Sequence, residues 1–91
     1  MQPTTQNKID TPAAQAILRR HSEAKGGREM SNVEDWKAGE TTSVSVGPRL
    51  YAFQAPWSAQ LFGRAVMGDL AVEAGIEIRV SVSQRPEQFG S

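Results

Sequence analysis

Residues 56–74 read PWSAQLFGRAVMGDLAVEA, a pattern that predicts one long central helix. Pro56 suits the first position of a helix, and Gly75 suits the left-handed position after its end. On a helical wheel of about 100° per residue, the apolar side chains form two bands that are separated by two narrow polar strips. A surface helix normally carries one apolar stripe, so we expect this helix to be covered on two sides.

The two bands of this helix differ in bulk. The wider band should pack on a sheet, while the narrower band should be available to a partner or to another part of the chain. The wider band contains Ala59, Phe62, Gly63, Val66, Met67, Leu70 and Ala74, and the narrower one contains Trp57, Leu61, Ala65, Gly68 and Val72.

Three segments around the helix have strand patterns. Residues 42–46 alternate polar and apolar side chains, and residues 49–53 are rich in strand formers after the turn signal Gly47-Pro48. Residues 76–83 show the clearest alternation, with Ile76, Ile78, Val80 and Val82 on one face. The predicted fold is α+β, with a small three-stranded sheet in β-β-α-β order and the long helix packed on it.

The rest of the chain is less apolar and divides around this core. Thr11 and Pro12 form a helix-start signal, and Gly26-Gly27 form a stop, but Ile17 and Leu18 are the only bulky apolar residues between them. We therefore predict a disordered leader at 1–10, an N-terminal helix at 11–26, a flexible linker at 27–40, the core at 41–86 and a polar tail at 87–91.

Composition excludes several classes of protein. The 91 residues include no cysteine, and ten Lys and Arg balance ten Asp and Glu, so the formal net charge is zero. There can be no disulfide framework, and the default expectation is a reducing cytoplasm. No apolar run is long enough for a signal peptide or a membrane span, and no basic face favours nucleic acid.

Catalytic groups are sparse. His21 is the only histidine, and its position near Ile17 and Leu18 is typical of a packing residue. The adjacent carboxylates Glu34 and Asp35 should point apart, and no spacing fits a metal site or a phosphate loop. We expect no enzyme, no cofactor, no metal and no small-molecule substrate.

The leading functional expectation is a small protein that binds another protein as an inhibitor or adaptor, by occluding a partner surface. The alternative is a homo-oligomeric assembly protein, because the last predicted strand has no central proline or inward charge to block edge pairing. A second alternative is a binder of single-stranded nucleic acid, provided that Arg49, Tyr51, Phe53 and Arg79 share one sheet face. The expected partner-binding residues are Trp57, Leu61, Ala65, Val72 and Trp36.

No motif identifies a family. In its size, neutral charge and compact core, the chain resembles small proteins encoded by phages and mobile elements, which include inhibitors of host defence. That resemblance implies a protein that acts by binding.

Overall fold

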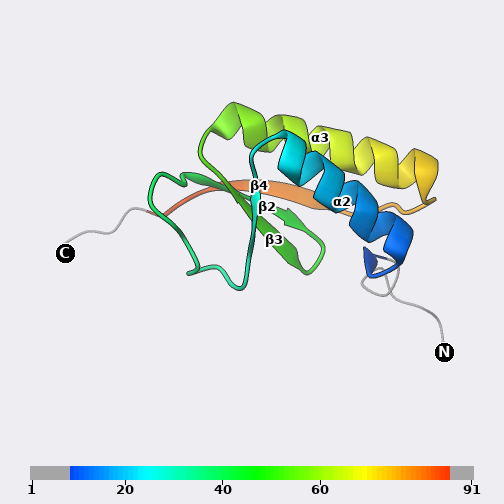
Figure 1. The fold of residues 1–91 in the computed structure, drawn as a ribbon, viewed down its shortest axis with the longest axis horizontal. Coiled ribbons are helices and arrows are strands. Elements are labelled where there is room, and N and C mark those ends of the chain that lie inside the picture. Colours follow the sequence, from blue (N-terminus) through cyan, green and yellow to red (C-terminus); the bar gives the residue numbers. More distant parts are fainter. Residues whose placement is uncertain (1–8, 87–91) are drawn as a thin grey trace.

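The computed structural model describes residues 9–86 as two helices packed on one face of a four-stranded antiparallel sheet (Figure 1). The strands lie in the order β1-β3-β2-β4, so β1 and β4 form the two edges. Helix α3 lies over β2, β3 and β4, and α2 contacts both α3 and β1. The elements are α2 (Pro12–Ala24), β1 (Arg28–Met30), β2 (Thr42–Val46), β3 (Arg49–Phe53), α3 (Pro56–Glu73) and β4 (Val80–Gln84).

Both helices begin and end near the predicted signals. The Thr11 hydroxyl accepts a hydrogen bond from the Ala14 N–H at 3.3 Å, which caps α2 ahead of Pro12. Helix α2 ends at Ala24, slightly before the predicted end at residue 26. Gly75 follows α3 with a φ of +66°, the conformation that glycine adopts most readily after a helix.

Strands β2 and β3 form a hairpin at the turn signal Gly47-Pro48. Val46 pairs with Arg49, so Gly47 and Pro48 form a two-residue turn. Gly47 has a φ of +59°, which fits a type II′ turn, and the second position of that turn takes the negative φ that a proline ring imposes. The proline is therefore compatible with the tight hairpin.

The prediction of three strands is wrong, because a short fourth strand lies inside the expected linker. Residues Arg28–Met30 form β1 and pair with Ala52, Tyr51 and Leu50 of β3. A three-residue strand is too short to show an alternating pattern, and its partner strand and the contacts of Arg28 hold it in place. The sheet therefore extends beyond β3, and α2 has a strand beneath it.

The last strand begins later than predicted. Residues 76–79 are irregular, and pairing with β2 starts at Val80. The Ile76 N–H bonds to the Leu70 carbonyl at 2.9 Å, so the backbone here closes the end of α3 before it can join the sheet. Ile76 is still buried, whereas Val82 is 40% exposed because it lies on the edge strand.

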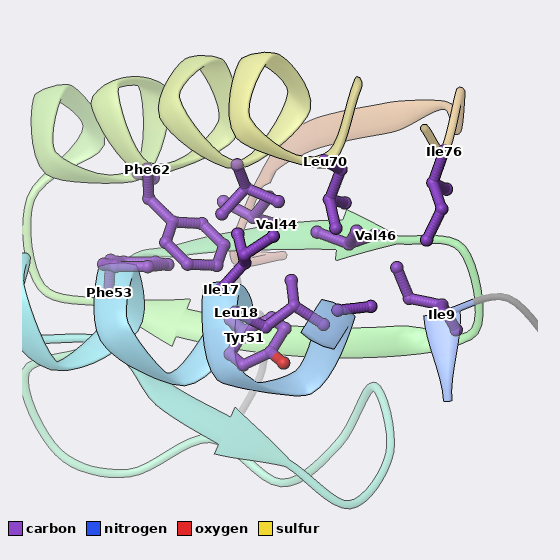
Figure 2. Packing of buried hydrophobic residues seen from close by; sticks show 13 residues of the cluster. Ile9, Ile17, Leu18, Val44, Val46, Tyr51, Phe53, Phe62, Leu70 and Ile76 are labelled. Atoms are coloured by element: carbon purple, nitrogen blue, oxygen red, sulfur yellow. The ribbon is translucent and has the colours of Figure 1, made fainter. Parts of the chain in front are cut away.

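The core is a single layer between the helices and the sheet (Figure 2). Phe62 of α3 points down onto β3, where its ring centroid lies 5.0 Å from that of Tyr51 and 4.9 Å from that of Phe53. Ile9 is fully buried in the same cluster, although it falls within the expected leader. The remainder of that leader, 1–8, and the expected tail, 87–91, lie outside the described residues.

Candidate interaction surfaces

The outward side of α3 carries an apolar ridge, which we define as Trp57, Leu61, Ala65 and Val72. Trp57 is 65% exposed and Val72 is 85% exposed, while Leu61 is exposed and Ala65 is half-buried. The opposite side of the helix supplies Phe62, Val66 and Leu70 to the core. The α3 ridge is thus an apolar surface that neither the sheet nor α2 covers.

Helix α2 contacts α3 along a polar seam that leaves the ridge uncovered. His21 Nε2 lies 2.5 Å from Asp69 Oδ2, and Arg20 reaches both Asp69 at 3.0 Å and Glu73 at 3.2 Å. The hydrogen bond from His21, followed by the one from Arg20, lowers the pKa of the Asp69 carboxyl below its ordinary range. His21 therefore joins the two helices, and α2 covers the flank of α3 next to the ridge.

Trp36 lies on a different side of the molecule from the α3 ridge. It lines a groove of about 470 Å³ on the open face of the sheet, which is the face opposite the helices. Met30, Val33 and Leu50 supply apolar walls to this groove. The Arg85 guanidinium lies 5.4 Å from the Trp36 ring centroid, a cation–π distance. The structure brings four of the five expected binding residues together and separates Trp36 from them.

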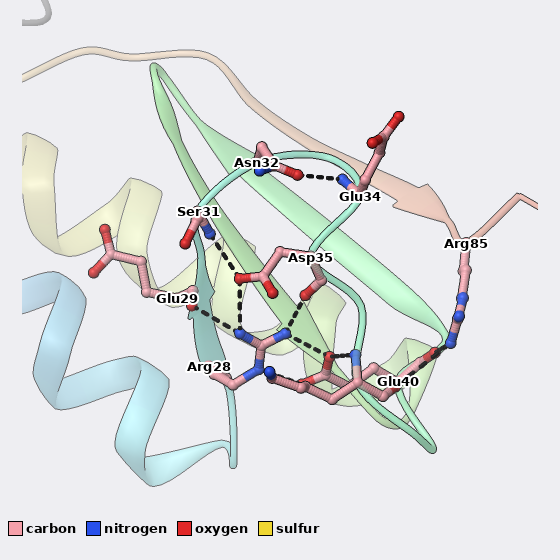
Figure 3. A network of polar contacts seen from close by, with 9 residues as sticks. Arg28, Glu29, Ser31, Asn32, Glu34, Asp35, Glu40 and Arg85 are labelled. Atoms are coloured by element: carbon pink, nitrogen blue, oxygen red, sulfur yellow. Dashed lines mark hydrogen bonds and ion pairs between the residues drawn. The ribbon is translucent and has the colours of Figure 1, made fainter.

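The loop that carries Trp36 is fastened by Arg28 (Figure 3). Its guanidinium donates to Glu40 through Nε at 2.9 Å and through Nη2 at 2.8 Å, and to the Asp35 carboxylate at 3.3 Å. Glu40 also accepts the Lys37 N–H at 2.7 Å. The segment expected to be a flexible linker thus contains a network of charged side chains around a half-buried arginine.

This network perturbs both carboxyl groups. The Arg28 hydrogen bonds are the main reason that the pKa of Glu40 lies below its ordinary value. For Asp35, the backbone N–H of Ser31 lowers the pKa most, and Arg28 adds to the effect. Both groups therefore favour their charged forms in the folded protein.

The helices cover the sheet face that carries Tyr51 and Phe53. Tyr51 and Phe53 point towards the helices and are buried in the core. Burial, more than the nearby Glu29 charge, raises the pKa of Tyr51 to about 12. These two rings therefore cannot form an exposed stacking platform on this face of the sheet.

The edge strand β4 exposes side chains that the sequence placed in the core. Met67, assigned to the sheet-facing band, is 47% exposed, and Val82 of β4 is exposed beside it. Together with Val80 they line a hollow of about 240 Å³ between α3 and β4. The helical wheel could not reveal this exposure, because it depends on where the sheet ends.

Some features are absent over residues 9–86. No three histidine or acidic side chains gather closely enough there to hold a metal ion. Neither helix in that range combines the length and the apolar character that crossing a bilayer requires.

Comparison with known proteins adds no relative. No protein-family model matches the chain, and searches of curated proteins and of solved structures found no match.

Proposed function

We propose that this chain is a non-enzymatic protein-binding protein, an inhibitor or adaptor that covers a partner surface with the α3 ridge. The observation that carries the proposal is the exposure of Trp57 and Val72 on a helix whose other side forms the centre of the core. Single exposed apolar side chains are common on protein surfaces, but a row of them along one helix is typical of an interaction site.

The chemistry of the ridge suits a protein partner. Tryptophan is enriched among the residues that dominate binding energy, because a large ring can fill a pocket and exclude water. An amphipathic helix can lay its outer row into an apolar groove of another protein, using residues three, four and seven positions apart. Leu61 and Ala65 follow Trp57 at successive intervals of four residues, which fits this mode.

The neutral net charge supports an apolar mode of binding over an electrostatic one. Trp36 would serve as a separate contact, since it lies across the sheet from the ridge. The proposed setting is the cytoplasm, and the resemblance to phage-encoded inhibitors belongs to the same proposal.

Replacing Trp57 and Leu61 together with glutamine should remove partner binding while preserving the fold. Truncating a tryptophan at a binding centre costs about 2 kcal/mol or more, which corresponds to a loss of affinity of roughly 30-fold. Glutamine is a good helix former, so we expect the free energy of unfolding to change by about 1 kcal/mol or less. The measurements are capture of host proteins by immobilised bait, titration calorimetry with the purified captured protein, and a thermal melt.

The matched control is Met67→Gln, which removes another exposed apolar side chain, 47% exposed, from the β4 side of the same helix and outside the ridge. This variant should bind as the wild type does. Equal binding by all three proteins would contradict the proposal, and so would a double variant that no longer folds, because it would place the ridge in the core.

A further inference from the structure

Within residues 9–86 no strand pairs with the outer edge of β4, and the register of the sheet shows which backbone groups this edge presents. The Gly47 N–H bonds to the Arg79 carbonyl at 3.4 Å, and the Arg85 N–H bonds to the Thr41 carbonyl at 2.7 Å. Hydrogen-bonded and non-hydrogen-bonded positions alternate along an antiparallel pair. Residues 79, 81, 83 and 85 therefore direct their backbone groups to β2, while Val80, Val82 and Gln84 direct theirs outward.

From this geometry we propose that two copies of the chain pair through their β4 strands, antiparallel and about a twofold axis at Val82. In that register Val82 lies opposite its own copy, and Val80 lies opposite Gln84 of the second copy. All three outward-facing residues then form hydrogen-bonded pairs, each exchanging two backbone bonds, and the two sheets join into one. The inference is independent of the α3 ridge, which lies on another side of the helix.

We infer that the partner of the β4 edge is a second copy of the chain, because the edge is complementary to itself. The outward backbone N–H and C=O groups of β4 are arranged symmetrically about Val82. When two copies of the strand pair antiparallel about a twofold axis at that residue, every one of these groups finds a partner, as in an isologous contact. The strand Val80–Gln84 contains no ionisable side chain, so self-pairing brings no like charges together within it. It also lacks the proline, lysine or bulge that normally protects an exposed edge.

Side chains beside the edge add an apolar contact to the backbone pairing. Val82 and Met67 are both close to half exposed, and they line the hollow between α3 and β4. In the twofold arrangement the Val82 side chains of the two copies meet on the helix-bearing face, where each can fill space beside the hollow of the other.

Arginines lie near the proposed contact: Arg64 lines the hollow beside Val82, and Arg79 and Arg85 flank the strand. The register places Arg79 opposite Arg85 of the second copy. Arg85 lies over Trp36 of its own chain and donates to the Lys37 and Glu40 carbonyls at 3.4 Å each. The guanidinium of Arg85 therefore already makes hydrogen bonds and a cation–π contact within its own chain.

Sedimentation equilibrium on the full chain should show a concentration-dependent shift from the 9.9 kDa monomer to a dimer. Val82→Pro should abolish that shift, because it removes an N–H that points outward and leaves the bonds to β2 in place. A thermal melt of this variant at low concentration should resemble that of the wild-type monomer. The double variant of Trp57 and Leu61 should still dimerise, which separates this inference from the proposed function.

A charge pair at Val82 tests the register directly and does not depend on how proline is tolerated. Val82→Lys and Val82→Glu should each be monomeric, because identical charges would meet at the twofold axis. An equimolar mixture of the two should recover a dimer that contains one copy of each. A wild type that stays monomeric at about 1 mM, variants that dimerise alone, or a mixture that stays monomeric would each overturn the proposal.

Discussion

Phe62→Ala should lower the free energy of unfolding by about 3–5 kcal/mol, the largest effect we expect from a single substitution. Phe62 is fully buried, and its ring packs against both Tyr51 and Phe53. Removing it leaves a cavity at the point where α3 meets β3, and the neighbouring rings can fill it only in part. Small domains have only about 5–15 kcal/mol of total stability, so the variant should melt at a much lower temperature.

Val72→Ala is the matched control, since it removes an apolar side chain from the same helix. Val72 is 85% exposed, so the free energy of unfolding should change by no more than about 0.5 kcal/mol. Urea denaturation followed by circular dichroism measures both variants. A larger loss for Val72→Ala than for Phe62→Ala would mean that the two faces of α3 have been exchanged.

The centres of the buried and exposed faces of α3 could be predicted because they follow from helical periodicity. Phe62, Val66 and Leu70 recur at intervals of four residues, which places them on one side of any helix. Met67 sits at the margin of that side. Whether such a marginal residue is covered depends on the width of the sheet beneath it, and the sheet stops at β4.

The fourth strand could not be predicted for a different reason. Strand β1 has three residues, and its only periodic signal is Met30, which is buried, next to Glu29, which is exposed. Its place in the sheet is set by β3 and by contacts from Arg28 to Asp35 and Glu40, between seven and twelve residues away. Such contacts have no signature in local composition, which in this segment is typical of a loop.

The candidate surfaces show the same limit. The residues of the α3 ridge can be predicted from a helical wheel. The position of Trp36 on the other side of the molecule depends on the topology of the sheet. The unprotected character of β4 could be read from its residue types. Which of its backbone groups point outward needed the pairing register with β2, because a shift of one residue would reverse them.

Glu40→Ala should destabilise the fold by about 2–3 kcal/mol at neutral pH, the second largest effect. The side chain of Glu40 is almost fully buried and accepts two hydrogen bonds from Arg28 and one from the Lys37 N–H. Alanine leaves the half-buried guanidinium with Asp35 as its remaining carboxylate partner. Glu34→Ala is the control, because Glu34 is an exposed acidic residue of the same loop, and its loss should change little.

The contribution of Glu40 should also depend on pH, with a sign that its lowered pKa fixes. In the unfolded chain the carboxyl has its ordinary pKa of 4.5, whereas in the folded protein Arg28 lowers that pKa. The unfolded state therefore binds the proton first as the pH falls, and the stability that Glu40 provides is complete above pH 4.5 and is lost below it.

In Glu40→Gln this acid-dependent loss should be absent. The difference in unfolding free energy between wild type and Glu40→Gln, measured by urea denaturation at a series of pH values, should be largest near neutrality and narrow below pH 4.5. A difference that stays constant through the acid range would show that the charge of Glu40 contributes nothing, and that the loop is held by hydrogen-bond geometry alone.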